Sequence, residues 1–269
     1  MNTDLPALKL FLQNMWQDYC HMTPEAHSIY KTLTQSGEHI QNDHIALRTF
    51  NHPKLGIKSL AQHFTKYGYA EKGEYFFTEK KLYAKHYEHP NSDLPKIFIS
   101  ELELEKSSAY IQEIINSIID QLKVEKTNDE NFVFGGKHWN TYYQTYEKLA
   151  AESEYASWVY AYGFRPNHFT VSINHLKNFK DIQKLNTFIK ERGYKLNASG
   201  GEIKGTPEEL LEQSSTMAKE SLVQFSDGVY LIPACYYEFA KRYPMSNGQL
   251  YQGFIAKSAD KIFESTHKL

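Results

Sequence analysis

Hydrophobic and polar positions in the first half of the chain follow two periods in succession. Residues 43–50 alternate with a period of two, which predicts a strand, and residues 56–67 carry apolar side chains at helical spacing. A polar turn between residues 75–77 and 82–87 predicts a hairpin, and residues 95–104 alternate again. This order predicts a βαβββ unit.

The same order of periods returns in the second half. Residues 167–174 predict a strand, and residues 180–192 predict a helix that ends at Gly193. The tripeptide Ser-Asp-Gly at 226–228 lies between two short apolar runs and predicts a hairpin turn, and residues 234–241 predict the last strand. We therefore expect a second βαβββ unit.

A short helix is expected between residues 206 and 213 of this second unit. Thr206 is a suitable N-cap, Pro207 suits the first helical position, and Glu209 completes a capping box. Helical spacing or start signals also occur outside the two units, at residues 5–19, from Thr23 onward, and at 107–122, 139–162 and 258–263.

These elements predict the α+β class. The paired βαβββ modules are expected to form a cup-like curved mixed sheet with additional helices, within a single catalytic domain over residues 1–269. The expected parts are a helical preface (1–40), the first module (41–104), a helical connecting insert (105–162), the second module (163–243) and a closing C-terminal segment (244–269).

Composition and charge exclude several kinds of partner. The formal net charge is -2, with Lys+Arg 30 against Asp+Glu 32 and no basic tract, so nucleic acid is not expected as a partner. No run of apolar residues reaches the length of a membrane span, and the first residues do not form the apolar region of a signal peptide. The only cysteines, Cys20 and Cys235, fit reduced thiols. We expect a cytoplasmic protein, and the sequence does not indicate its oligomeric state.

Candidate chemistry begins at the two predicted strands that open the modules, because each carries a histidine beside a polar residue. His44 and Arg48 are four residues apart and therefore lie on one face of the first strand, and His168 occupies the corresponding start of the second. The last strands add Glu101 and Glu238 as candidate carboxylates. Two imidazoles and one carboxylate form the facial set that leaves open positions on a divalent iron, whereas a closed structural zinc site would use cysteines.

Each candidate also has a purely structural interpretation. A strand histidine is often just a hydrogen-bonded side chain, and Arg48 could pair with a structural carboxylate rather than hold a substrate carboxylate through a bidentate fork. Glu101 lies in an alternation that a solvated sheet edge explains equally well. Glu238 is favoured as the third ligand, because its strand is otherwise aromatic and an isolated carboxylate there would be costly to bury.

Four motifs together resemble the 2-oxoadipate dioxygenase/decarboxylase family, also called hydroxyglutarate synthases. They are Asp-His-Ile-Ala-Leu-Arg-Thr-Phe at 43–50, Phe-Arg-Pro-Asn-His-Phe-Thr at 164–170, Gln-Ser-Ser-Thr-Met-Ala at 213–218 and Ala-Asp-Lys-Ile-Phe-Glu-Ser-Thr at 259–266. The resemblance implies a vicinal oxygen chelate-type fold. It also implies a mononuclear iron(II) held by His44, His168 and Glu238, with Arg48 as the substrate-binding arginine.

The implied reaction converts 2-oxoadipate and dioxygen to 2-hydroxyglutarate and carbon dioxide. The chain is short compared with the lysine-catabolic members of that family, so a different 2-oxo or 2-hydroxy acid stays open as the substrate. Two further alternatives also stay open. One is a metal-dependent lyase, isomerase or hydrolase that uses zinc, nickel or manganese on the same fold, and the other is a non-enzymatic module that sequesters a ligand.

Overall fold

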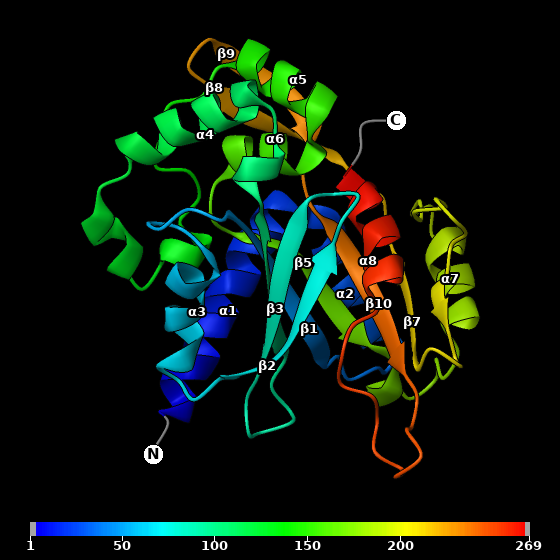
Figure 1. The fold of residues 1–269 in the computed structure, drawn as a ribbon. Coiled ribbons are helices and arrows are strands. Elements are labelled where there is room, and N and C mark those ends of the chain that lie inside the picture. The colour runs from blue at the N-terminus through cyan, green and yellow to red at the C-terminus, as the bar shows by residue number, and fades with distance from the viewer. Residues whose placement is uncertain (1–3, 267–269) are drawn as a thin grey trace.

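The computed structural model describes residues 4–266 and contains one large curved sheet with helices around it (Figure 1). The eight strands follow the order β2-β3-β4-β1-β5-β10-β7-β6. Those of the first half are β1 (Asn42–Phe50), β2 (Ala70–Phe77), β3 (Leu82–Glu88) and β4 (Lys96–Leu102). Those of the second half are β5 (Pro166–Ser172), β6 (Lys204–Thr206), β7 (Leu211–Ser215) and β10 (Tyr236–Arg242).

The two halves of the sheet have the same internal pairing. In each half the first and last strands pair in parallel, β1 with β4 and β5 with β10, and the remaining strands continue outward in antiparallel pairs. The halves join where β1 and β5 pair antiparallel in the middle of the sheet. The paired modules expected from the sequence are therefore present, and β1, β5 and β10 lie side by side at their junction.

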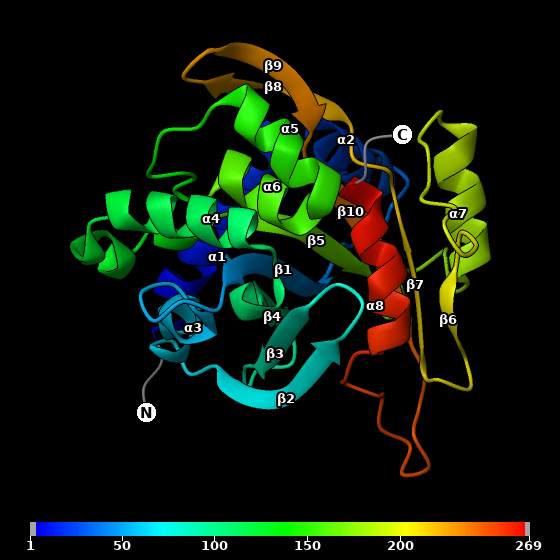
Figure 2. The ribbon, with the colours of Figure 1, turned by 45° about the horizontal axis from the view of Figure 1, so that its top comes forward.

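Helices cover both sides of this sheet. The sequential helices are α1 (Leu5–Met22), α2 (Pro24–Gln35), α3 (Ile57–Thr65), α4 (Ala109–Gln121), α5 (Tyr143–Glu152), α6 (Glu154–Tyr162), α7 (Ile182–Glu191) and α8 (Ala256–Phe263). The ring of Phe169 on β5 packs against Trp16 and Tyr19 of α1, with ring centroids 5.0 Å apart in both pairs. On the other side α8 contacts β2 at one edge and β6 and β7 at the opposite edge, so it crosses the open side of the curved sheet (Figure 2).

Strand alternation decides which residues face the inside of the cup. Residues 44, 46 and 48 of β1 share the inner face, whereas Ile45 and Leu47 point into the core on the other side. The helices that follow β1 and β5 end as predicted, because Gly68 and Gly193 adopt φ values of 94° and 83° that favour glycine.

Three predicted elements differ from the structure. The helix expected at 206–213 is wrong: the chain forms β6, a turn and β7 instead. Thr206 does accept a hydrogen bond from the backbone N–H of Glu209, at 3.2 Å, but Leu210 then takes a φ of 64° and the chain turns back on itself. The capping signal is therefore real, but it builds a tight turn, because Leu211–Ser215 pairs with β10.

The other two differences concern a hairpin and a helix. The hairpin expected around residues 226–228 forms as β8 (Glu220–Phe225) and β9 (Gly228–Pro233), but it makes a separate two-stranded sheet and does not join the cup. The helix expected over 139–162 is two helices, because Ser153 breaks it and caps the second by accepting from the N–H of Ala156.

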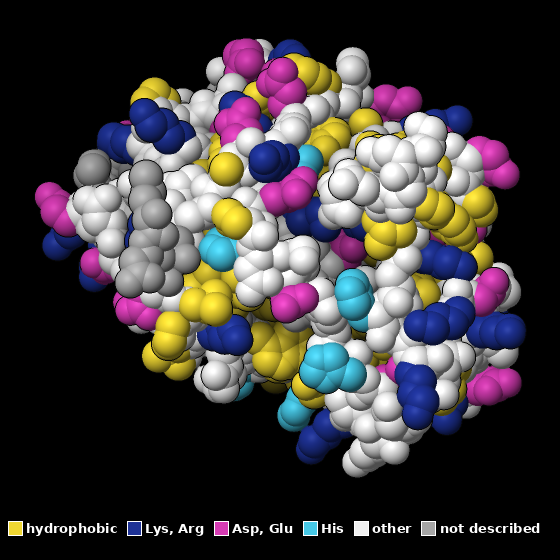
Figure 3. All heavy atoms as spheres, turned by 90° about the horizontal axis from the view of Figure 1, so that it is seen from below, with side chains coloured by type: hydrophobic (Ala, Val, Ile, Leu, Met, Phe, Trp, Pro, Cys, Tyr) yellow, Lys and Arg dark blue, Asp and Glu magenta, His cyan; other side chains and the backbone are white. Residues whose placement is uncertain are grey.

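Two expectations from the sequence concern the distribution of charge on the surface and the presence of membrane-spanning helices. On the face shown in Figure 3, lysine and arginine side chains are interspersed with aspartate and glutamate, in keeping with the near-neutral net charge. Among the helices of residues 4–266, none has both the length and the apolar character needed to cross a bilayer.

Candidate metal centre

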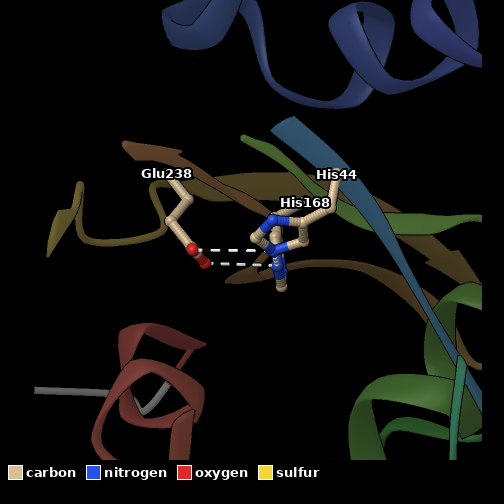
Figure 4. Close-up of side chains that lie close together, drawn as sticks. All are labelled: His44, His168 and Glu238. Atoms are coloured by element: carbon tan, nitrogen blue, oxygen red, sulfur yellow. Dashed lines mark hydrogen bonds and ion pairs between the residues drawn. The ribbon is translucent and has the colours of Figure 1, made fainter. Parts of the chain in front are cut away.

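Three inward-facing side chains meet where β1, β5 and β10 adjoin. His44 lies opposite Thr170, which lies opposite Glu238, and His168 is two residues before Thr170 on the same face. The two Nε2 atoms are 3.3 Å apart, and the Glu238 carboxylate lies 3.6 Å from Nε2 of His44 and 3.2 Å from Nε2 of His168 (Figure 4). One ligand atom from each residue thus lies within 4.8 Å of the others.

Each histidine is oriented by the polar residue that precedes it. Nδ1 of His44 lies 2.9 Å from a carboxylate oxygen of Asp43, and Nδ1 of His168 lies 3.1 Å from the amide oxygen of Asn167. Because both partners are acceptors, Nδ1 carries the hydrogen in each ring and Nε2 presents a lone pair to the centre. Burial lowers the pKa of His44, against the opposing effect of Asp43, and burial lowers the pKa of His168 further. Both imidazoles are therefore held in the neutral form that binds metals.

Glu238 completes the cluster as a fully buried carboxyl group. Gln213 donates its amide N–H to Oε1 at 2.6 Å, whereas Oε2 has no hydrogen-bond partner among the described residues. Burial raises the pKa of Glu238 to about 8. When Glu238 is ionised, as a metal ligand must be, and both imidazoles are neutral and protonated on Nδ1, the contact between Oε2 and His168 brings two lone pairs together. A cation between the three residues would satisfy all of these atoms, so the residues fit a divalent metal.

The polar shell behind His44 includes an ion pair that the sequence did not reveal. Arg242 on β10 donates from Nε and Nη2 to the two carboxylate oxygens of Asp43, at 2.7 and 2.8 Å. Although burial opposes its ionisation, Asp43 has a pKa well below its usual range, because Arg242 and the His44 hydrogen bond stabilise the charge. The polar residues before the two histidines were visible in the sequence, but no local pattern links Arg242 to residue 43.

Arg48 lies on the same inner face as His44 and is 1% exposed. Its Nη1 donates to Glu154 at 2.7 Å, its Nη2 lies 3.3 Å from the hydroxyl of Thr266, and its Nε has no partner among residues 4–266. Burial opposes the charge, but Glu154 raises the pKa of Arg48, so the guanidinium stays charged. The ion pair with a structural carboxylate that the sequence left open therefore exists, but Glu154 contacts only the Nη1 end of the guanidinium.

Glu101 does not join the cluster. It lies opposite Thr49, which is on the outer face of β1, so its side chain points away from His44. There its carboxylate accepts the N–H of Ile57 at 2.8 Å, at the start of α3. Glu101 therefore caps a helix.

Aromatic rings enclose the cluster on two sides. Phe254 lies edge-on to His44, with ring centroids 4.9 Å apart, and Tyr236 stacks on His168 at 4.6 Å with an interplanar angle of 26°. Sequence reasoning did not assign Tyr236, Phe254 or Gln213 to the site. Each is a residue type common in cores. Strand register places Tyr236 and Gln213 beside the cluster, whereas Phe254 comes from the segment between β10 and α8.

Comparison with known proteins places this cup among enzymes of one family. The 2-oxoadipate dioxygenase/decarboxylase family matches residues 3–250. The chain is 37% identical, over 95% of its own length and 77% of the relative's, to the 2-oxoadipate dioxygenase/decarboxylase, chloroplastic/amyloplastic, of Oryza sativa subsp. japonica.

Solved structures agree with this match. The hydroxyglutarate synthase of Oryza sativa, solved in complex with 2-oxoadipate, has a TM-score of 0.90 at 35% identity, over 97% of this chain and 92% of that chain. A protein of Shewanella frigidimarina described as a hydrolase has a TM-score of 0.89 at 53% identity, over 95% and 99% of the two chains. The fold is also shared by a glyoxalase superfamily protein of Ralstonia eutropha, which is 18% identical. Its TM-score is 0.73, over 91% of this chain and 84% of that chain. These matches confirm the vicinal oxygen chelate-like architecture.

Proposed function

This chain belongs to the 2-oxoadipate dioxygenase/decarboxylase family, and from that premise we propose that it converts 2-oxoadipate and dioxygen to 2-hydroxyglutarate and carbon dioxide. We propose iron(II) as its metal, held by His44, His168 and Glu238. The observation that supports this most directly is the convergence of two lone-pair nitrogens and an unpaired carboxylate oxygen in one buried cluster. The equation balances, because both dioxygen atoms enter the products and one carbon leaves as carbon dioxide.

Iron(II) in such a facial set would supply open positions for the 2-oxo acid and dioxygen and the electrons for oxygen activation. The protein's own residues determine the rest. Asp43 and Asn167 keep the imidazole lone pairs directed at the centre, and Gln213 fixes one oxygen of Glu238. We propose that both modules act as one catalytic domain, since His44 comes from the first and His168 and Glu238 from the second.

Arg48 is proposed to bind a carboxylate of the substrate. Nε and Nη2 form one edge of the guanidinium, and this edge has only the long contact to Thr266. Glu154 occupies Nη1 and holds the side chain in place. A carboxylate could therefore bind bidentately to the free edge without displacing Glu154.

Burial of the site supports oxidative chemistry. His44, His168 and Glu238 are 2%, 4% and 0% exposed. Phe254 and Tyr236 supply aromatic walls beside the two imidazoles. A site closed to bulk water protects reactive species and strengthens the interaction of Arg48 with an anion.

Dioxygen uptake by the iron-loaded protein tests the proposal. Protein stripped of metal, reconstituted anaerobically with iron(II) and mixed with 2-oxoadipate should consume dioxygen and release carbon dioxide and 2-hydroxyglutarate in equal amounts. Related acids, 2-oxoglutarate and 2-oxohexanoate, test the chain length and the distal carboxylate. If none of the three acids drives dioxygen uptake, the dioxygenase proposal fails. Turnover of a substrate by the zinc-loaded protein without dioxygen would instead favour a lyase, isomerase or hydrolase.

A further inference from the structure

The hydroxyl group of Tyr236 is buried inside the cup without a hydrogen-bond partner. Tyr236 is 0% exposed, and none of the described residues accepts from or donates to its hydroxyl. Phenol hydroxyls that are buried normally find a partner, because leaving one unpaired destabilises the folded protein. The group is therefore a candidate for contact with a bound ligand.

Strand register places the Tyr236 side chain beside His168 in the candidate metal centre. Tyr236 lies opposite His168 on the neighbouring strand, and its ring is stacked on the imidazole. A tyrosine side chain is longer than that of histidine, so the hydroxyl extends beyond the Nε2 atom toward the interior of the cup. The backbone holds this position, because the carbonyl of Tyr236 accepts a hydrogen bond from the hydroxyl of Tyr19.

The same hydroxyl lies between the carboxylate ligand and the substrate arginine. Across the three strands, His44 is level with Thr170 and Glu238, and Ala46 is level with His168 and Tyr236. Tyr236 is therefore displaced from Glu238 along the strands, in the direction of Arg48. Both Glu238 and Arg48 act electrostatically on the Tyr236 hydroxyl. A 2-oxo acid that reaches from the metal centre to the free edge of Arg48 would pass this group.

We propose that Tyr236 donates a hydrogen bond to the oxygen of the bound 2-oxo acid that lies between the metal centre and Arg48. The hydroxyl and the free edge of Arg48 then form a clamp of three N–H and O–H donors for one anionic group. This inference rests on the proposed function, because it assumes that the ligand is a 2-oxo acid. It assigns a substrate-binding role to a residue outside the three proposed metal ligands.

Tyr237 provides a matched control on the same strand. It is also 0% exposed, and its hydroxyl also lacks a hydrogen-bond partner among the described residues. As the next residue of β10, it points to the opposite face, where its ring lies 5.8 Å from that of Trp16. A change from tyrosine to phenylalanine therefore removes an equivalent atom at both positions, but only position 236 faces the cup.

The experiment compares Tyr236→Phe with Tyr237→Phe. In the metal-free protein, both variants should unfold at the same temperature as the wild type or higher, since each loses a buried unpaired hydroxyl. In the iron-loaded protein, anaerobic calorimetry with 2-oxoadipate should show a dissociation constant raised about 10-fold or more in Tyr236→Phe, the loss typical of a hydrogen bond to a charged group. Tyr237→Phe should bind like the wild type.

Three outcomes would overturn the clamp. They are wild-type affinity in Tyr236→Phe, an equal loss in Tyr237→Phe, and an effect confined to the KM for dioxygen. Failure of the proposed function would be recognised by a different result, because the wild type itself would then fail to oxidise any 2-oxo acid. A wild type that binds no 2-oxo acid would overturn both ideas.

Discussion

Glu238→Gln should make the metal-free protein more stable than the wild type, by an amount that grows with pH. Glu238 is completely buried, and burial raises its pKa from 4.5 to about 8, with Asp43 adding to the shift and Gln213 opposing it. A buried acid with a raised pKa leaves stability intact below its unfolded-state pKa. The cost then increases as pH rises toward the folded-state pKa, because the unfolded chain releases the proton more readily.

The size of this effect follows from the shift. At about 1.4 kcal/mol per pKa unit, burial of the carboxyl group costs roughly 3 kcal/mol at pH 7 and about 5 kcal/mol at pH 9. Glutamine has nearly the same shape, can accept the same hydrogen bond from Gln213, and does not ionise. The stability advantage of the variant should therefore grow by roughly 2 to 3 kcal/mol between pH 5.5 and pH 7.5.

Urea unfolding of metal-stripped wild type and Glu238→Gln at pH 5.5, 6.5 and 7.5 measures this difference. The titration of His44 and His168 occurs in both proteins and largely cancels. Glu238→Gln should also lose the metal, whereas Glu101→Gln, a matched change on the outer face of the same sheet, should keep it. A stability difference that does not change with pH, or full metal content in Glu238→Gln, would refute the reasoning.

Two further substitutions test the polar shell and the substrate arginine. Asp43→Ala should lower metal affinity by about 10- to 100-fold in a chelator competition assay, because it removes the acceptor that orients His44. It should also lower the free energy of unfolding by about 3 kcal/mol or more, since Arg242 would stay buried without its counterion, and unchanged affinity would contradict the role of Asp43. The Arg48→Lys variant should still bind the metal, and lysine keeps a positive charge near Glu154. The KM for the 2-oxo acid should nevertheless rise about 10-fold, because lysine cannot bind a carboxylate through two parallel N–H donors. Loss of metal in that variant would instead show that Arg48 supports the metal centre.

Strand alternation and the family resemblance together predicted most of the residues that the structure brings together in the candidate site. The strands over residues 43–50 and 167–174 are present as β1 and β5, and the period of two correctly placed Arg48 on the face of His44. An isolated carboxylate in an aromatic strand correctly singled out Glu238 as a buried group that needs a partner. These are local properties, which a single stretch of sequence contains.

Register between strands was the part that the sequence could not supply. Glu101 and Glu238 both lie on the last strand of a module, and only the pairing of Glu101 with Thr49 shows that its side chain faces outward. The pairs between Asp43 and Arg242 and between Gln213 and Glu238 join residues 199 and 25 positions apart. The turn at Leu210 likewise depends on the pairing of β7 with β10, which overrides the local helix signal.

The matching pairing of the two halves also explains why the candidate metal centre has three potential protein ligands rather than four. In the second half, His168 lies opposite Tyr236, and Glu238 is two residues further along β10. In the first half, His44 lies opposite Lys96, so the residue that corresponds to Glu238 is Phe98. Phe98 packs against Phe254, with ring centroids 4.9 Å apart, and Phe254 in turn covers His44. The second half thus supplies a carboxylate where the first supplies only aromatic carbon. A metal held by these three residues alone would keep open positions for a chelating 2-oxo acid and dioxygen, so the asymmetry between two similar halves fits the centre to the proposed reaction.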